Sequence, residues 1–147
     1  MDVNIYIETS IKAPHRGYGT GMYLIECPAA PDNVAKGFVD FPDTTEDATT
    51  LTALIEALGR FTKESNIRIF TKCNGVFCGL DTGRIQTARM NGWMNAKGFP
   101  NKNAELWDIF ISLISKHHYT ITQEDHSFME LMKNDLKHHK SVMKKAI

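Results

Sequence analysis

The residues best placed for chemistry are Glu8 and Lys72, because each lies at the end of a segment with the pattern of a β-strand. Residues 3–8 alternate apolar and polar side chains, and residues 67–72 form a β-rich run that breaks into small and polar residues. In an open α/β sheet, chemistry is concentrated beyond the carboxyl ends of the strands. A carboxylate at such an end could bind a metal ion, and a lysine could contact phosphate or act as a counter-ion.

The first part of the chain has the pattern of antiparallel strands. Three segments have the pattern of β-strands, at 3–8, 19–26 and 34–41, and the first alternates apolar and polar residues. Turn-forming residues such as Pro, Gly and Asn separate them, which predicts successive hairpins. Pro42 and Asp43 are expected to end the third strand.

The pattern then changes to the period of a helix. Apolar residues recur three and four positions apart, at Leu51, Leu54, Ile55, Leu58 and Phe61. Thr44 or Thr45 is available as the N-cap, and the acidic residues that follow favour a first turn. Because this helix joins the third strand to residues 67–72, the order strand–helix–strand implies that 67–72 pairs in parallel with the first strand.

The rest of the chain is predicted to be mainly helical. We expect helices at 74–80 and 82–91, an irregular segment at 92–102, a helix capped by Asn103, a strand at 119–122 and a final helix at 128–140. The expected organisation is a single domain at residues 1–140. Residues 141–147 are expected to be a C-terminal tail that frays.

Composition narrows the classes of function. The 147 residues suffice for one buried core, and 17 basic residues balance 17 acidic ones. This balance excludes a strong overall field that would draw the protein onto nucleic acid or an anionic membrane. No apolar run reaches membrane-spanning length, and the three cysteines cannot all pair. We therefore expect a cytoplasmic protein with no membrane partner, and we interpret Cys73 and Cys78 as small buried thiols.

The order of elements resembles the ribonuclease H type 1 family, and short motifs along almost the whole chain support the resemblance. They are residues 7–10 followed by 17–19, then 51–58, 69–71, 92–103 and 106–107. The resemblance implies an α/β fold with a five-stranded mixed sheet, in which three antiparallel strands precede the parallel ones, flanked by helices. Enzymes of this family cut the RNA strand of RNA–DNA hybrids and hold two magnesium ions between four carboxylates.

The resemblance also assigns the family's site positions to residues of this chain. Glu8 takes the first-strand position, where the family has an aspartate. Thr50 takes the place of the glutamate on the first helix, and Lys72 that of the aspartate after the fourth strand. Asn134 takes the place of the last carboxylate, and His126 is the counterpart of the family's mobile histidine.

A hydroxyl, an amide and an ammonium group cannot hold two divalent ions. Two unit charges about 4 Å apart interact by roughly 4 kcal/mol at an effective dielectric constant of 20, and a divalent ion near a lysine would feel about twice that as repulsion. We therefore expect no metal cofactor, and we expect Lys72 to pair with Glu8 in place of the metal. This predicts a ribonuclease H-like protein that has lost its catalytic site, rather than an enzyme.

The first functional hypothesis is a non-catalytic module that binds nucleic acid, either an RNA–DNA hybrid or another duplex. Cations are available to contact phosphates, and an aromatic residue to stack on bases. These candidate contacts are Lys12, Arg16, Arg89, Trp93, Lys97 and Lys102. Trp93 could equally anchor its irregular segment to a neighbouring helix.

Two alternatives remain open. The same fold could serve as an adaptor domain that binds a protein partner. The chain could also be a weakly active hybrid endonuclease that uses Mg²⁺ or Mn²⁺, in a shifted register where Asp47 and Asp135 join Glu8. Asp135 lies about 100° around the helix from Asn134, which disfavours that register.

Overall fold

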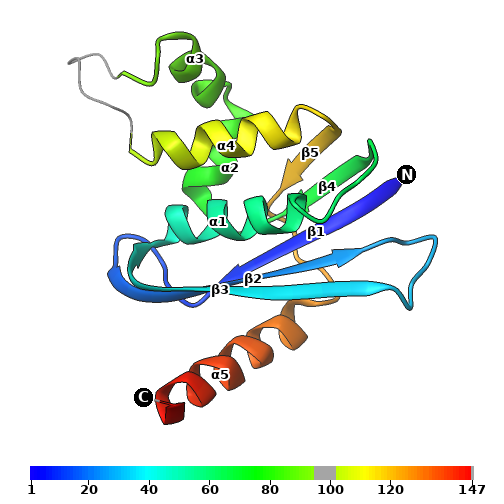
Figure 1. The fold of residues 1–147 in the computed structure, drawn as a ribbon, viewed down its shortest axis with the longest axis vertical. Helices are drawn as coiled ribbons and strands as arrows, with labels where there is room; N and C mark the ends of the chain where they lie inside the picture. Colours follow the sequence, from blue (N-terminus) through cyan, green and yellow to red (C-terminus); the bar gives the residue numbers. More distant parts are fainter. Residues whose placement is uncertain (95–101, 147) are drawn as a thin grey trace.

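The computed structural model describes residues 1–94 and 102–146, with the backbone alone described for 140–146. Among these residues, five strands form one mixed sheet (Figure 1): β1 (Asp2–Thr9), β2 (Arg16–Glu26), β3 (Val34–Thr45), β4 (Asn66–Phe70) and β5 (His118–Thr122). The strand order is β3-β2-β1-β4-β5. This architecture confirms the predicted five-stranded mixed sheet.

The pairing of the strands follows from how they are connected. Turns join β1 to β2 and β2 to β3, and both pairs are antiparallel. A helix separates β3 from β4, and β4 pairs in parallel with β1, with Ile69 beside Ile5. The fifth strand continues in parallel, with Ile121 beside Ile69. The predicted parallel pairing of the first and fourth strands is confirmed.

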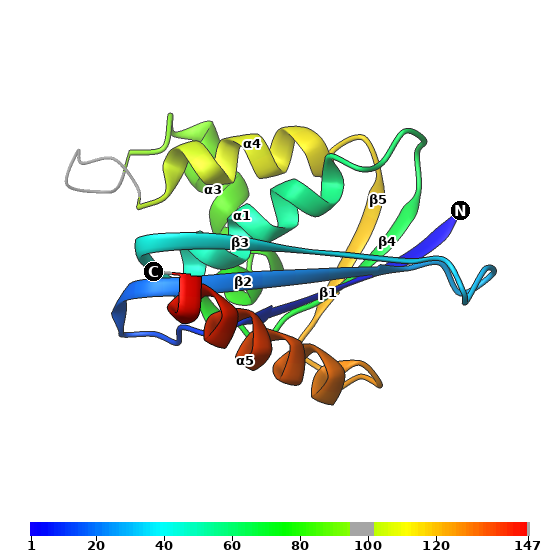
Figure 2. The same ribbon diagram turned by 60° about the horizontal axis from the view of Figure 1, so that its bottom comes forward.

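Helices cover both faces of the sheet. They are α1 (Glu46–Leu58), α2 (Asn74–Asp81), α3 (Arg84–Met90), α4 (Ala104–Ile114) and α5 (Met129–Ala146). Figures 1 and 2 show α1 and α4 on one face and α5 on the other. The larger core, around Leu54, Ile69 and Phe110, lies on the α1 side, and a smaller one around Met22 and Met132 lies under α5.

The α1 helix is positioned by its first turn and by its apolar face. The Thr45 side chain accepts a hydrogen bond from the Ala48 N–H, as an N-cap should. Leu51 and Leu54 are fully buried, which agrees with their predicted core positions. The helix ends at Leu58, so Phe61 lies in the loop beyond it and still packs partly buried against the core.

The structure corrects the predicted end of the third strand. Strand β3 continues through Pro42 and Asp43 to Thr45. It lies at the edge of the sheet, where a proline can lack its N–H without breaking a ladder on both sides. A shift of register between Gly17 and Gly19 on β2 accommodates the continued pairing.

Other boundaries also differ from the prediction, among them the start of β2 at Arg16 and the ends of β4 and α5. Strand β4 ends at Phe70, and the chain then turns, with the Cys73 N–H donating to the Thr71 hydroxyl. Helix α5 runs to Ala146, beyond the predicted end at residue 140. Within the described part of the chain, no helix combines the length and apolar character needed to cross a membrane.

Candidate functional site

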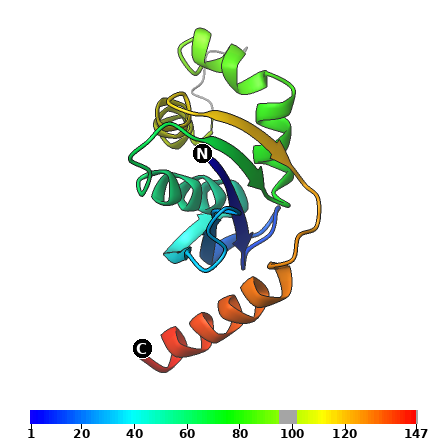
Figure 3. The ribbon, with the colours of Figure 1, turned by 90° about the vertical axis from the view of Figure 1, so that its right-hand side faces the viewer.

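A cleft of about 700 Å³ lies between the carboxyl end of β1 and helix α5. Figure 3 shows the segment after β5 crossing to the face of the sheet on which α5 lies. The cleft is lined by Glu8, Thr9, Ser10, Lys12, Lys72, Met129, Glu130, Lys133, Asn134, Leu136 and Lys137. Three of the four carboxylate positions assigned from the resemblance therefore lie in one cleft, at Glu8, Lys72 and Asn134.

Glu8 is the buried acid of the cleft. It lies near the end of β1 opposite Met22 of β2, with a relative exposure of 4%, and its Oε1 has no hydrogen-bond partner. Burial raises the pKa of Glu8, because the charged carboxylate loses hydration. The positive charges of Lys12, Lys133 and Lys72 oppose this effect without cancelling it.

The predicted ion pair between Lys72 and Glu8 is wrong. The Lys72 ammonium instead pairs with Asp125, with 2.7 Å between Nζ and Oδ1, and donates to the carbonyl of Gln123. Since β5 runs parallel to β4, the loop after β5 begins beside the residue that follows β4. The hydrogen bond and charge of Lys72 lower the pKa of Asp125.

Thr50 and Asn134 are placed differently from each other. Thr50 is fully buried on α1, and its hydroxyl oxygen makes no hydrogen bond of normal geometry. It does not line the cleft. Asn134 is exposed on α5 and does line it.

The structure does not bring Asp47 and Asp135 together with Glu8, as the shifted register would require. Asp47 accepts a hydrogen bond from the Cys73 thiol, with 3.2 Å between Oδ1 and Sγ. Asp135 pairs with Lys36 of β3 at 2.8 Å, as its angular offset from Asn134 would suggest. Neither aspartate lines the cleft with Glu8.

His126 packs on aromatic rings. Its imidazole stacks on Tyr6 with 4.2 Å between ring centroids, and the edge of Phe70 lies nearby. The Nδ1 atom accepts a hydrogen bond from the Phe128 N–H. Burial, followed by the charge of Lys72, lowers the pKa of His126. The structure therefore favours a neutral imidazole held in place by stacking.

Both predicted phosphate-binding arginines form ion pairs with carboxylates. Arg16 pairs with Asp43 at 3.0 Å between Nε and Oδ1, across the ends of β2 and β3. Arg89 pairs with Asp108 of α4 at 3.5 Å. Each pair is solvent-exposed, so an incoming phosphate could compete for the arginine.

Of the four remaining predicted contacts, three lie among the residues that the structure describes. Trp93 is half-buried and packs against the larger core, which favours its role as an anchor. Lys102 is exposed and lies beside a small hollow at the start of α1. Lys97 lies outside the described residues. Lys12 is the member of the predicted set that lines the cleft.

Sequence reasoning missed two lysines of the cleft, Lys133 and Lys137 on α5. The spacing of residues along the final helix could have identified these two lysines. Lys137 follows Lys133 by four residues and Asn134 by three, so all three share one side of the final helix. The assignment of Asn134 to the site therefore also points to Lys133 and Lys137.

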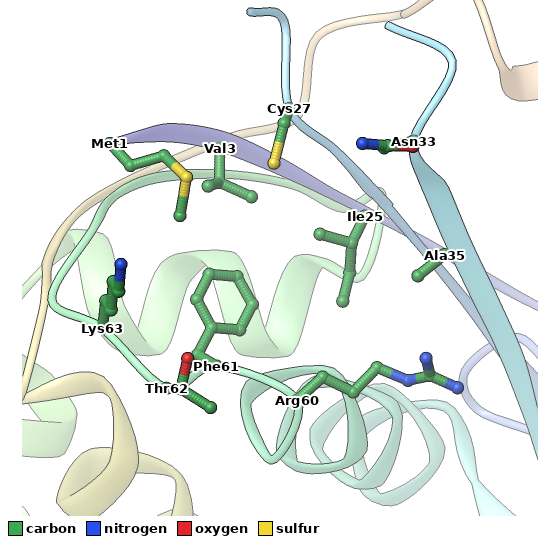
Figure 4. A pocket seen from close by; sticks show the side chains of 10 residues that line it. All are labelled: Met1, Val3, Ile25, Cys27, Asn33, Ala35, Arg60, Phe61, Thr62 and Lys63. Carbon is green, nitrogen blue, oxygen red and sulfur yellow. The ribbon is translucent and has the colours of Figure 1, made fainter. Parts of the chain in front are cut away.

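A second hollow lies at the other end of β1. Its volume is about 300 Å³, and Figure 4 shows its lining side chains, with Phe61 pointing into it among Val3 and Ile25. Its lining residues are largely apolar and include no carboxylate. It is therefore unsuited to metal-dependent chemistry.

The side chains of the cleft do not fit a pair of divalent metal ions. The carboxylates on its lining are Glu8, which is buried among lysine charges, and Glu130. At the positions that the resemblance assigns to the first helix and to the end of the fourth strand, the chain has the neutral Thr50 and the positively charged Lys72. Divalent ions of the magnesium type prefer several negatively charged oxygen ligands, and the described lining of the cleft offers Glu8 and Glu130.

Comparison with known proteins relates the sequence to ribonucleases H. No protein-family model matches the chain. It is 40% identical over 79 residues to a ribonuclease H of Ehrlichia canis, covering 54% of this chain and 53% of that protein. It is 38% identical over 87 residues to a ribonuclease H of Parvibaculum lavamentivorans, covering 56% and 57%. The chain thus matches about half the length of these curated relatives.

Solved structures show the same fold over most of the chain. A type 1 ribonuclease H with a type 2 active-site motif, LC9-RNase H1, superposes with a TM-score of 0.68 at 20% identity, over 86% of this chain and 64% of that one. The N-terminal ribonuclease H domain of rv2228c from Mycobacterium tuberculosis gives 0.58 at 12% identity, over 86% and 89%. A foamy viral protease-reverse transcriptase in complex with RNA/DNA hybrid gives 0.60 at 13%, over 92% and 18%.

Proposed function

This chain is ribonuclease HI-like in sequence and in fold, and on that premise we propose that it is a non-catalytic module that binds RNA–DNA hybrids or related duplexes. The observation that carries the proposal is Lys72. Its ammonium group stands at the strand end where the family resemblance calls for a metal-binding aspartate, and it is held there by Asp125. A positive charge at this point favours a phosphate over a divalent cation.

The charge of the whole cleft supports the same ligand. Four lysines line it, against two carboxylates, although the chain as a whole is neutral. The lysines are Lys12, Lys72, Lys133 and Lys137. Lysine contacts to phosphates supply affinity without reading sequence, which suits a protein that holds the backbone of a duplex.

The burial of Glu8 supports binding without cleavage. Its raised pKa and unpartnered oxygen describe a carboxyl group that is costly to keep charged. A raised pKa makes Glu8 a poorer ligand for a divalent cation, because the cation binds the charged carboxylate. The remaining side chains of the cleft are then compatible with an anion.

The test compares binding and cleavage of the same labelled duplexes. A 5′-labelled RNA–DNA hybrid, a DNA duplex and an RNA duplex are titrated with the protein by fluorescence anisotropy at about 50 mM salt, where phosphate contacts are strongest. The same hybrid is incubated with Mg²⁺ or Mn²⁺ and resolved on a denaturing gel. We expect binding of the hybrid and no cleavage with either metal.

Matched lysine variants show whether the cleft is the binding surface. Lys133→Gln removes a cleft charge, whereas Lys116→Gln removes an exposed lysine just after α4. Weaker binding is expected from the first variant and unchanged binding from the second. Absence of binding to all three duplexes would favour the protein-adaptor alternative. Hybrid cleavage that Glu8→Ala abolishes would show a working nuclease.

A further inference from the structure

A second cluster of chemically reactive side chains lies at the start of α1 and α2, outside the lysine-lined cleft. It consists of Glu46, Asp47 and Cys73, and one ligand atom of each lies within 4.8 Å of the others. Glu46 and Cys73 are buried, and Asp47 is half-buried. None of the three lines the cleft around Glu8.

The local fold brings these residues together. The Thr45 cap begins α1, so Glu46 and Asp47 fall in its first turn, while Cys73 is the residue immediately before α2. A Cβ atom on Gly75 would lie 2.4 Å from Asp47 Oδ2. Glycine therefore allows the carboxylate to lie directly against the first turn of α2, whose N-terminal end favours negative charge.

An unsatisfied polar atom lies beside the cluster. Thr50 is one turn along α1 from Asp47 and has no exposed surface. Its side chain lies near the Cys73 thiol, yet its hydroxyl oxygen makes no hydrogen bond of normal geometry. Buried hydroxyls are normally satisfied, so this one indicates that a further group belongs near the thiol.

We propose that Glu46, Asp47 and Cys73 bind a single divalent cation of the zinc type. A thiolate with two carboxylates is a donor set for Zn²⁺, Co²⁺ or Cd²⁺, whereas Mg²⁺ and Ca²⁺ prefer oxygen ligands alone. A hollow of about 110 Å³, lined in part by His15, Glu46 and Asp47, gives access from solvent. The proposal does not rest on the proposed binding of nucleic acid, although Lys12 lines the cleft and also pairs with Glu46.

Without a metal ion, the three proposed ligands contact other groups, and a bound cation must replace some of these contacts. The thiol donates a hydrogen bond to Asp47, with 3.2 Å between Sγ and Oδ1, and Lys12 Nζ lies 3.8 Å from Glu46 Oε2. On binding, the S–H bond breaks, a sulfur–metal bond forms and the proton passes to solvent. The Lys12 side chain is 53% exposed and can swing away. The backbone N–H of Ala13, which donates to Glu46 Oε1, can remain in place.

Cobalt(II) provides a direct spectroscopic test with the tag-free full chain. We expect one equivalent of Co²⁺ to produce a near-ultraviolet thiolate charge-transfer band that Zn²⁺ then displaces. Cys73→Ser should abolish the band. Asp47→Asn should weaken Co²⁺ binding at least about tenfold, since even outer-shell partners of a metal site contribute factors of 10–100. The matched controls Cys27→Ser and Cys78→Ser should retain both the band and the affinity.

The controls also define what would overturn the site. Saturating Co²⁺ without a thiolate band, or a band that persists in Cys73→Ser, would refute it. Equal affinity in Asp47→Asn and in the wild type would also refute it, with circular dichroism confirming that each variant is folded. Lys12→Gln is expected to bind Co²⁺ more tightly, because it removes the cation beside Glu46, and weaker binding by this variant would contradict the assignment.

Discussion

The number of lysines in the cleft sets a quantitative expectation for how salt weakens duplex binding. Each phosphate that the protein neutralises contributes roughly −0.9 to the slope of log K against log salt concentration. If each of the four cleft lysines contacts one phosphate, the slope is about −3.6, and raising salt from ~50 to ~200 mM weakens binding roughly 150-fold.

Removing one lysine should change the slope by a defined amount. Lys133→Gln is expected to reduce it to about −2.7, so that the same increase in salt weakens binding only ~40-fold. Lys72→Gln should behave differently, because it also leaves Asp125 without its partner. Asp125→Asn, which frees the Lys72 ammonium, is expected to strengthen binding at low salt.

Fluorescence anisotropy at four or more salt concentrations measures these slopes. Lys116→Gln, outside the cleft, is the matched control and should retain the wild-type slope. If Lys133→Gln and Lys116→Gln change the slope equally, the cleft is not the phosphate-binding surface. A wild-type slope near zero would refute the electrostatic reasoning altogether.

Three further predictions concern stability and thiol chemistry. Burial raises the pKa of Glu8, so the free energy of unfolding should fall as pH rises through that pKa. In urea denaturation, Glu8→Gln should therefore be more stable than the wild type at neutral pH. The difference in unfolding free energy between the two proteins should disappear in acid. Met132 is fully buried under α5, and Met132→Ala should lower the free energy of unfolding in urea by about 2–5 kcal/mol; a loss well below this range would show a loosely packed α5. Burial raises the pKa of the Cys73 thiol to about 12. In the metal-free native protein, a disulfide reagent should therefore modify the half-buried Cys27 and Cys78 quickly, and Cys73 only on unfolding. Equal rates of modification at all three thiols would contradict the burial of Cys73.

Much of the fold could be predicted because it depends on local periodicity. The residue pattern of the first three strands and the helical spacing of Leu51 and Leu54 identify elements without any knowledge of distant contacts. The helix between two strands then implies their parallel pairing. The ends of elements are harder to predict, because local signals are weakest there. Pro42 predicts the end of a strand, but β3 lies at the edge of the sheet and continues through this proline.

By itself, the sequence determined that a lysine follows the fourth strand of a ribonuclease H-like chain, since residue type and order are enough for that inference. Tertiary structure decided which groups this lysine meets. Its partner Asp125 lies beyond β5 and is brought near only by the parallel pairing of β4 and β5. The contact between Asp47 and Cys73 likewise joins residues 26 positions apart. Ion pairs and ligand clusters depend on distances between elements, and these distances exist only once the sheet and its helices have packed.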